Sequence, residues 1–65
     1  MKLIINGEER ISAETVLSEV ITTLDFEGAW FATAVNGELV CRDDRASFAL
    51  KDGDRIEILS PMQGG

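Results

Sequence analysis

The sequence of 65 residues contains no histidine, one cysteine (Cys41) and one proline (Pro61). Without histidine, neither a Ser-His-Asp triad nor a Cys-His pair can form, which excludes the common designs of a nucleophilic active site. A single cysteine excludes a disulfide within the chain and fits a reducing compartment. Nothing near Cys41 in the sequence would activate its thiol, so we expect an inert, small apolar side chain.

Basic residues are also scarce: 6 Lys and Arg stand against 12 Asp and Glu, for a formal net charge of −6. Nucleic-acid binding needs a basic patch that neutralises phosphates, so we expect no nucleic-acid partner and, for the same reason, no membrane partner. The sequence has no apolar run long enough to span a bilayer and no secretion signal. We therefore predict a cytoplasmic protein, and its acidity favours a partner protein with a basic groove.

Motifs for phosphate or metal binding are missing as well. Neither of the common glycine-rich phosphate-binding motifs occurs. Neighbouring carboxylates are found at Glu8-Glu9, Asp43-Asp44 and Asp52/Asp54. Such pairs can bind a metal ion or act as acid and base, but all three fall on predicted turns, where we expect them to face water. We therefore predict no metal site and no cofactor bound by this chain.

A strand and a hairpin are predicted at the start of the chain. Alternation in the first strand would place Leu3 and Ile5 on one face and Ile4 on the other. Asn6-Gly7 then predicts a tight turn, because both residues accept a positive φ. The return strand is expected over about residues 9–13, with Ile11 facing inward.

A helix is predicted to follow the hairpin. Thr15 is a suitable N-cap, because its hydroxyl can accept a hydrogen bond from an amide in the first helical turn. The apolar residues after it recur at helical spacing and would form one buried stripe: Val16, Leu17, Val20, Ile21 and Leu24. Residues 25–28, which end in glycine, are predicted to form the exit loop.

Three more strands are predicted in the second half, over residues 30–36, 39–42 and 55–60. The turn signals Asn36-Gly37 and Asp52-Gly53 separate them, and residues 42–45 indicate a turn or a short helical start. We expect four bulky side chains from this half in the core, in addition to those of the last strand: Trp30, Phe31, Phe48 and Leu50. For Trp30 and Phe31, a contact surface is the alternative.

The last strand shows clear alternation. Ile56 and Ile58 would face the core, while Arg55, Glu57 and Leu59 would face outward. An apolar side chain on the outer face, close to the final residues, suggests that Leu59 is a docking point for a partner.

The predicted elements follow the order β-β-α-β-β-β. They indicate an α+β fold, in which a mixed sheet of about five strands packs on one helix and the first and last strands lie side by side. We predict a domain over residues 1–60 and a flexible C-terminal tail over residues 61–65, because Pro61 cannot donate to a strand ladder. Glycine has no Cβ, so Gly64 and Gly65 could enter a narrow channel and present the carboxylate of Gly65. A frayed end without function is the alternative.

Several segments of the sequence match a known pattern: residues 1–8, 15–16, 34–40 and 51–58, and the terminal Gly64-Gly65. On these segments the chain resembles, over its whole length, the small ubiquitin-like sulfur carriers, and in particular the ThiS family of bacterial thiamine biosynthesis. A Gly-Gly end alone is a weak signal, but the same end a short distance after Asp-Gly-Asp, on a chain of this element order, is a specific one. The resemblance implies a β-grasp (ubiquitin-like) fold.

The resemblance also implies a carrier rather than an enzyme. In that family an adenylyltransferase uses ATP and Mg²⁺ to adenylate the C-terminal carboxylate. Sulfur from a donor such as a cysteine desulfurase then converts it to a thiocarboxylate, which supplies thiazole synthase with sulfur for the thiazole ring. For this chain the resemblance implies that Gly65 is the reacting residue, and that four further residues contact the partners: Gly64, Gln63, Met62 and Leu59.

Departures from the family pattern keep alternatives open. Many relatives have proline where this chain has Cys41, and residues 60–63 resemble the small subunit of molybdopterin synthase, another thiocarboxylate carrier. That subunit is usually longer, so the length of this chain favours the thiamine pathway. A ubiquitin-like modifier joined to lysines and a plain protein-interaction domain are the remaining alternatives.

Overall fold

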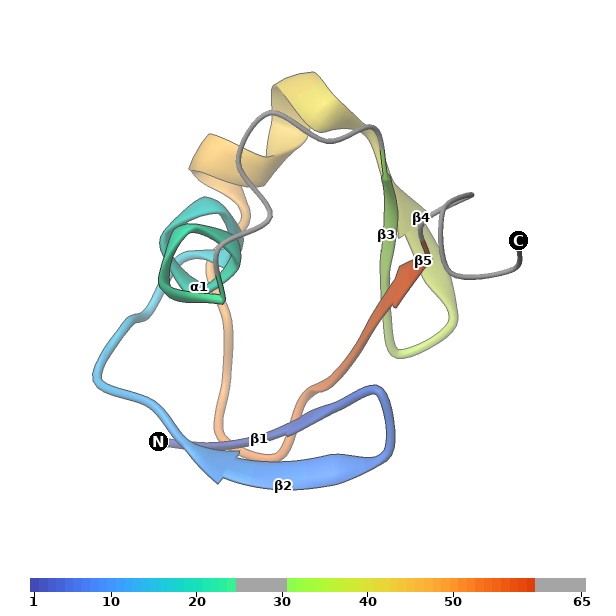
Figure 1. Cartoon of the computed structure of the whole chain (residues 1–65). Coiled ribbons are helices and arrows are strands. Elements are labelled where there is room, and N and C mark those ends of the chain that lie inside the picture. Colours follow the sequence, from blue (N-terminus) through green and yellow to red (C-terminus); the bar gives the residue numbers. More distant parts are fainter. Residues whose placement is uncertain (25–30, 60–65) are drawn as a thin grey trace.

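The computed structural model describes residues 1–24 and 31–59. Their elements are, in chain order, β1 (Lys2–Ile5), β2 (Glu8–Ile11), α1 (Leu17–Thr23), β3 (Ala32–Val35), β4 (Glu38–Val40), the 3₁₀ helix η1 (Arg42–Ser47) and β5 (Arg55–Leu59). The strand order across the sheet is β2-β1-β5-β3-β4, and the sheet curves around α1 (Figure 1). This confirms the predicted α+β fold, its element order and the neighbouring first and last strands.

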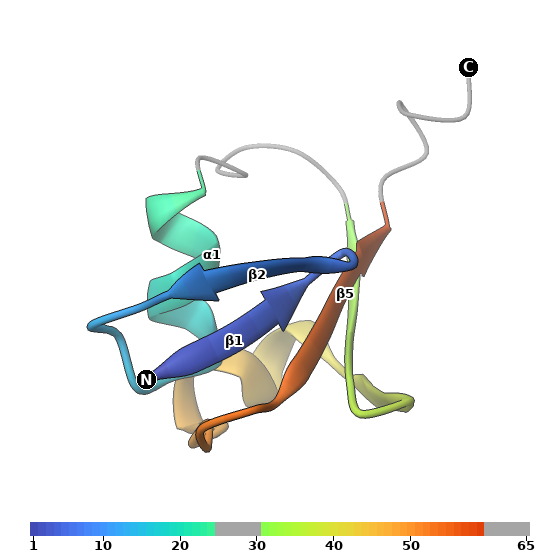
Figure 2. The same cartoon turned by 90° about the horizontal axis from the view of Figure 1, so that it is seen from below.

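The last strand, β5, lies at the centre of the sheet. It runs parallel to β1 and antiparallel to β3, so that Ile56 has Ile5 on one side and Val35 on the other. The outer pairs, β1–β2 and β3–β4, are antiparallel hairpins. Figure 2 shows β2 and β1 in front of α1, with β5 beside them. The pairing with β1 covers Arg55 and Ile56, and the pairing with β3 continues to Leu59.

The core lies between α1 and the face of the sheet that curves around it. The helix contributes Leu17, Val20 and Ile21, as the apolar stripe predicts. The strands and the segment before β5 add further buried side chains: Leu3, Ile5, Val35, Val40, Leu50, Ile56 and Ile58. Phe31 and Phe48 pack against this cluster and are partly buried. Because Leu17 is completely buried, its truncation to alanine should cost about 2–5 kcal/mol.

Both Asn-Gly turns are present as predicted. Asn6 and Asn36 have φ angles of 50° and 53°, and the glycines that follow them have φ angles of 86° and 83°. Two successive positive φ angles match the two-residue turn that fits the twist of a hairpin. Asparagine tolerates this conformation better than most residues with a side chain, which explains why these two positions carry it.

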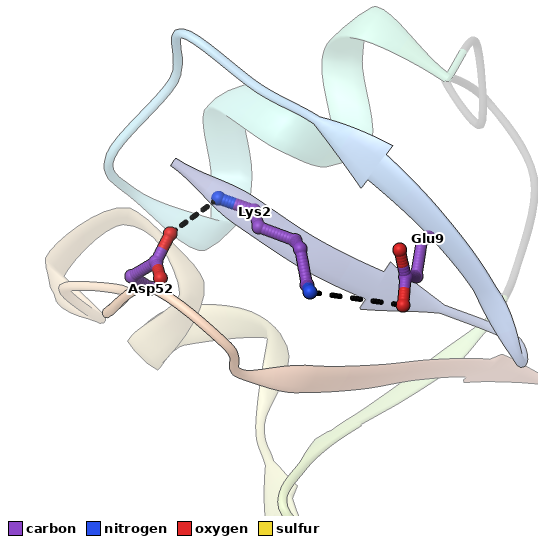
Figure 3. A network of polar contacts seen from close by, with 3 residues as sticks. All are labelled: Lys2, Glu9 and Asp52. Carbon is purple, nitrogen blue, oxygen red and sulfur yellow. Dashed lines mark hydrogen bonds and ion pairs between the residues drawn. The ribbon is translucent and has the colours of Figure 1, made fainter.

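The Asp52-Gly53 turn binds the start of β1. Lys2 donates its amide hydrogen to Asp52 Oδ1 at 2.6 Å, and its carbonyl accepts a hydrogen bond from Gly53 N at 2.6 Å. Figure 3 shows the first of these bonds beside the ion pair between Lys2 Nζ and Glu9 Oε2, 3.7 Å apart. This exposed ion pair adds at most about 1 kcal/mol, so the two hydrogen bonds of the Lys2 backbone hold the turn against β1.

The return strand of the first hairpin differs from the prediction. Ile11 is 83% exposed rather than buried. The turn pairs Ile5 with Glu8 and Lys2 with Ile11. Paired residues share a face of the sheet, and Lys2 lies on the face opposite to Ile5, so Ile11 lies on the outer face. The prediction was wrong because it began the strand one residue late, and a shift of one residue exchanges the two faces.

The helix also begins later than predicted. Its N-cap residue is Val16, without a side-chain hydrogen bond, so the prediction of Thr15 was wrong. Thr15 O instead accepts a hydrogen bond from Leu50 N at 2.8 Å, and Leu17 N donates to Phe48 O at 3.0 Å. This strand-like pairing keeps the backbone extended through Val16 and satisfies the first helical amide, so no hydroxyl is needed there.

Other expectations concern the limits of elements. β4 ends at Val40, earlier than predicted, and the exposed Cys41 precedes η1 instead of lying in the strand. The predicted exit loop over residues 25–28, Trp30 and Ser60 lie outside the described residues. Within the described part of the chain, no helix is long and apolar enough to cross a membrane.

Candidate functional site

Of the predicted partner-binding and reacting residues, the structure describes one. Leu59 is the last residue of β5. Four others lie outside the described residues: Met62, Gln63, Gly64 and Gly65. The structure therefore shows the end of β5 and the surface around it, from which the chain continues to the predicted reacting residue.

Leu59 lies on the outer face of the sheet, the face that α1 does not cover. It is 65% exposed, which confirms its predicted orientation, and Leu39 on β4 is 73% exposed. The register places Leu59 beside Ala32 and Leu39 beside Ala34, so that two alanines of β3 lie between the two leucines. We name these four residues the Leu39–Leu59 surface. Large apolar side chains that flank small ones form a shallow surface of the kind that partner proteins bind.

The sequence analysis identified Leu59 but missed Leu39. The signal was present in the alternation of β4, because a buried Val40 requires its neighbour Leu39 to face outward. The sequence analysis predicted a strand over residues 39–42 but not its partner strand, so it could not determine which face of this strand is buried. The register that brings β3 between the two leucines comes from tertiary pairing and could not be read from the sequence.

The end of β5 is held by the side chain of Asn6. Asn6 N donates to Ile56 O at 2.9 Å, which continues the parallel pairing of β1 with β5. The amide of Ile58 then donates to Asn6 Oδ1 at 2.8 Å. Because Asn6 has already entered the turn, its carboxamide oxygen serves as the acceptor that a strand carbonyl would otherwise supply.

Asn36 holds the start of β5 in the same way, with one addition. Asn36 N donates to Arg55 O at 2.8 Å, and Arg55 N donates to Asn36 Oδ1 at 3.0 Å. Asn36 Nδ2 also donates to Asp54 Oδ1 at 3.0 Å, while Lys51 N donates to Asp54 Oδ2 at 2.8 Å. Asp54 is only 9% exposed, so the prediction that it faces water was wrong. Both of its oxygens accept hydrogen bonds, which compensates for its burial.

Arg45 supports the strand that lies beside the end of β5. Its Nε donates to Thr33 Oγ1 and its Nη2 to Phe31 O, both at 2.9 Å, and the guanidinium lies 4.3 Å from the centre of the Phe31 ring. Burial of the guanidinium lowers the pKa of Arg45 from its usual value, and the charge of Arg42 lowers it further. Thr33 pairs with Ile58, so Arg45 stabilises β3 where it borders the end of β5.

Among residues 1–24 and 31–59, no three His, Cys, Asp or Glu side chains lie close enough to hold a metal ion. Cys41 is exposed and lies directly after β4.

Known proteins resemble this chain in sequence and in fold. A family model described as the ThiS family matches residues 3–65. The crystal structure of the thiamine biosynthesis protein ThiS from Geobacter metallireducens superposes with a TM-score of 0.82 at 29% sequence identity, over 100% of both chains, which confirms the β-grasp fold. A curated thiazole synthase of Paramagnetospirillum magneticum is 38% identical over 66 aligned positions. This match covers 100% of the chain and 20% of that protein, so the chain spans about a fifth of the curated relative.

Proposed function

The chain belongs to the ThiS family, and on this basis we propose that it is a sulfur carrier of thiamine biosynthesis that acts through the carboxylate of Gly65. The observation that carries the proposal is the range of the family match, which runs from residue 3 to residue 65 and so includes both final glycines. The chain would be a co-substrate of its partner enzymes and not itself an enzyme. We further propose that it works in the cytoplasm.

Three reactions would turn the Gly65 carboxylate into a sulfur donor. A carboxylate reacts poorly with nucleophiles, because it is negatively charged and oxide is a poor leaving group. On an adenylyltransferase, the carboxylate would attack the α-phosphate of Mg²⁺-bound ATP, so that pyrophosphate leaves and an acyl-adenylate forms. Persulfide sulfur from a donor such as a cysteine desulfurase would displace AMP, and reduction of the acyl disulfide by a thiol would leave the thiocarboxylate.

Thiazole synthase is the proposed acceptor of this sulfur. The similar curated protein is a thiazole synthase, and the similar solved structure is a thiamine biosynthesis protein. A carrier segment within the polypeptide of thiazole synthase would act on that same enzyme, which supports this enzyme as a partner of the chain. The same two relatives favour the thiamine pathway over that of molybdopterin.

We propose that the partners dock on the Leu39–Leu59 surface. Leu59 precedes residues 60–65, which span at most about 20 Å when extended, so a partner bound there would hold the Gly65 carboxylate within that distance. Glu57 lies on the same face, beside Ala34, and the net charge of the chain is −6. We therefore expect partner surfaces with an apolar centre and basic side chains around it. Met62, Gln63 and Gly64 would enter the active site of the partner.

The proposal is tested by measuring the exchange of pyrophosphate into ATP. The assay uses an adenylyltransferase that activates ThiS proteins. Exchange should require this chain and should be lost when one residue is added after Gly65, because the carboxylate then moves by about 3.5 Å and sits on a residue with a side chain. The matched control carries the same added residue before Met1 and should retain exchange. Exchange that persists with the chain extended after Gly65 would contradict the proposal.

A further inference from the structure

We propose that Asn6 is a positioning residue, whose carboxamide determines where β5 ends and therefore where the segment that carries Gly65 begins. The inference rests on the proposed function, in which this segment must reach the active site of a partner. Asn6 lies in the first hairpin, 52 positions before Ile58 in the sequence, and is not part of the Leu39–Leu59 surface.

Hydrogen bonds from the β1 side advance along β5 in steps of two residues. Ile4 N donates to Asp54 O at 3.0 Å, and Asn6 N donates to Ile56 O at 2.9 Å. The bond from Ile58 N to Asn6 Oδ1, at 2.8 Å, is the third step and the last that the described residues show on this side. Without the carboxamide, this support would end at Ile56, and Ile58 would be paired only with β3. The end of the central strand would then behave as an edge strand.

The position needs an asparagine for its conformation and for its oxygen. Its φ of 50° is accepted by asparagine, aspartate and glycine more readily than by other residues. In the described part of the chain the Asn6 carboxamide bonds only through Oδ1, to Ile58. Aspartate offers the same oxygen at the same reach, whereas glycine keeps the backbone conformation and removes the oxygen. These two substitutions therefore separate the hydrogen bond from the turn.

Loss of this bond would act on the docking of partners. Ile58 and Leu59 would leave the sheet for part of the time, so the Leu39–Leu59 surface would be incomplete and the segment before Gly65 would lengthen. A partner would have to order these residues when it binds, at a cost in conformational entropy. Because this cost falls on binding rather than on the reaction of the carboxylate, the KM for the carrier should rise while kcat changes little.

The test compares Asn6→Gly with the matched variant Asn36→Gly. Both replace an asparagine of positive φ, and both remove an oxygen that accepts from a β5 amide, at Ile58 in one case and at Arg55 in the other. We expect Asn6→Gly to accelerate amide hydrogen exchange at Ile58 about fivefold and to raise the KM in adenylation by a similar factor. Asn6→Asp should restore both values. Asn36→Gly should lower the thermal midpoint more, yet leave the KM within about twofold of the unchanged chain.

Each outcome decides a different step. Unchanged exchange at Ile58 in Asn6→Gly would overturn the inference without reference to any partner. Faster exchange with an unchanged KM, or an equal rise of the KM in Asn36→Gly, would show that the bond serves stability alone and would also overturn it. If an active enzyme fails to adenylate the unchanged chain, the proposed function is overturned, and the positioning role with it. The hydrogen-exchange data would still show whether the Asn6 side chain protects the Ile58 amide.

Discussion

The two ends of β5 are held by the same kind of bond, but their surroundings differ. At each end an asparagine of an Asn-Gly turn accepts a hydrogen bond from a β5 amide, Asn36 at the start and Asn6 near the end. At the start, Asn36 also donates to the buried Asp54. At the end, the next residue is the exposed Leu59. The asparagine at the start therefore makes an additional side-chain bond to a buried carboxylate, whereas the end leads directly to an exposed leucine on the face of the proposed partners.

This difference predicts which property each end controls. A polar group that loses its partner in the interior keeps the full cost of its burial, because water cannot replace the lost hydrogen bond. Loss of the Asn6 carboxamide removes one acceptor, that of the Ile58 amide, whereas loss of the Asn36 carboxamide also removes a donor to the buried Asp54, so the free energy of unfolding should change less at the end of β5. Substitutions at the start of β5 should therefore lower stability, and substitutions at its end should weaken partner binding.

The largest expected effect comes from Asn36→Asp. The new carboxylate still accepts from Arg55 N, but it loses the donor to Asp54 and places a second negative charge about 3 Å from Asp54 Oδ1. We expect the free energy of unfolding, measured with urea, to fall by about 3 kcal/mol. The matched change Asn6→Asp keeps the oxygen that accepts from Ile58 N and should stay within about 0.5 kcal/mol of the unchanged chain. Equal losses in the two variants would show that the two ends do not differ as described.

A smaller loss is expected for Arg45→Lys, which tests the strand beside the end of β5. Lysine cannot donate to Thr33 Oγ1 and Phe31 O in the fork geometry of arginine, and it lacks the planar group that lies over the Phe31 ring. The free energy of unfolding should fall by about 1.5 kcal/mol. Arg42→Lys, at an exposed position in the same 3₁₀ helix, is the control and should change it by less than about 0.5 kcal/mol. If Arg45→Lys leaves the free energy of unfolding unchanged, the stability of β3 does not depend on this contact.

The smallest effect on stability is expected for Leu59→Ser, because this side chain is 65% exposed. The free energy of unfolding should change by less than about 0.5 kcal/mol, while the KM for the carrier in adenylation should rise by roughly fivefold, since an apolar contact with the partner is lost. Ile11→Ser is the matched control: Ile11 is also exposed on the outer face, but on β2, away from the Leu39–Leu59 surface. A similar rise of the KM in both variants would argue against a docking surface at the end of β5.

Much of β5 and its turns could be predicted from the sequence, because the signals are local. Alternation separated Ile56 and Ile58 from Leu59, and the Asn-Gly pairs located both hairpin turns. The outward orientation of Leu59 followed from these signals without knowledge of the fold. Its role in binding partners stays a prediction, as do the roles of the residues after it.

The features that the sequence did not reveal depend on pairing between distant segments. Ile11 was assigned to the wrong face because the register of its strand differs by one residue. Thr15 was assigned a capping role that pairing with residues 48–50 makes unnecessary. Asp54 was expected to face water, but it is buried and accepts a hydrogen bond from the side-chain amide of Asn36, in the turn between β3 and β4. Residues that favour turns predict where a turn occurs, but they do not show which part of the protein the turn packs against.

The central claim is tested most directly by measuring the intact mass of the chain. The chain is first incubated with the adenylyltransferase, Mg²⁺-ATP, a persulfide donor and a reducing thiol. We predict the mass increase that replacement of one oxygen by sulfur requires, and fragmentation should localise it to Gly65. The chain with one residue added after Gly65 should keep its original mass. An unchanged mass for the native chain, with an enzyme shown to activate another ThiS protein under the same conditions, would contradict the claim that Gly65 carries the sulfur.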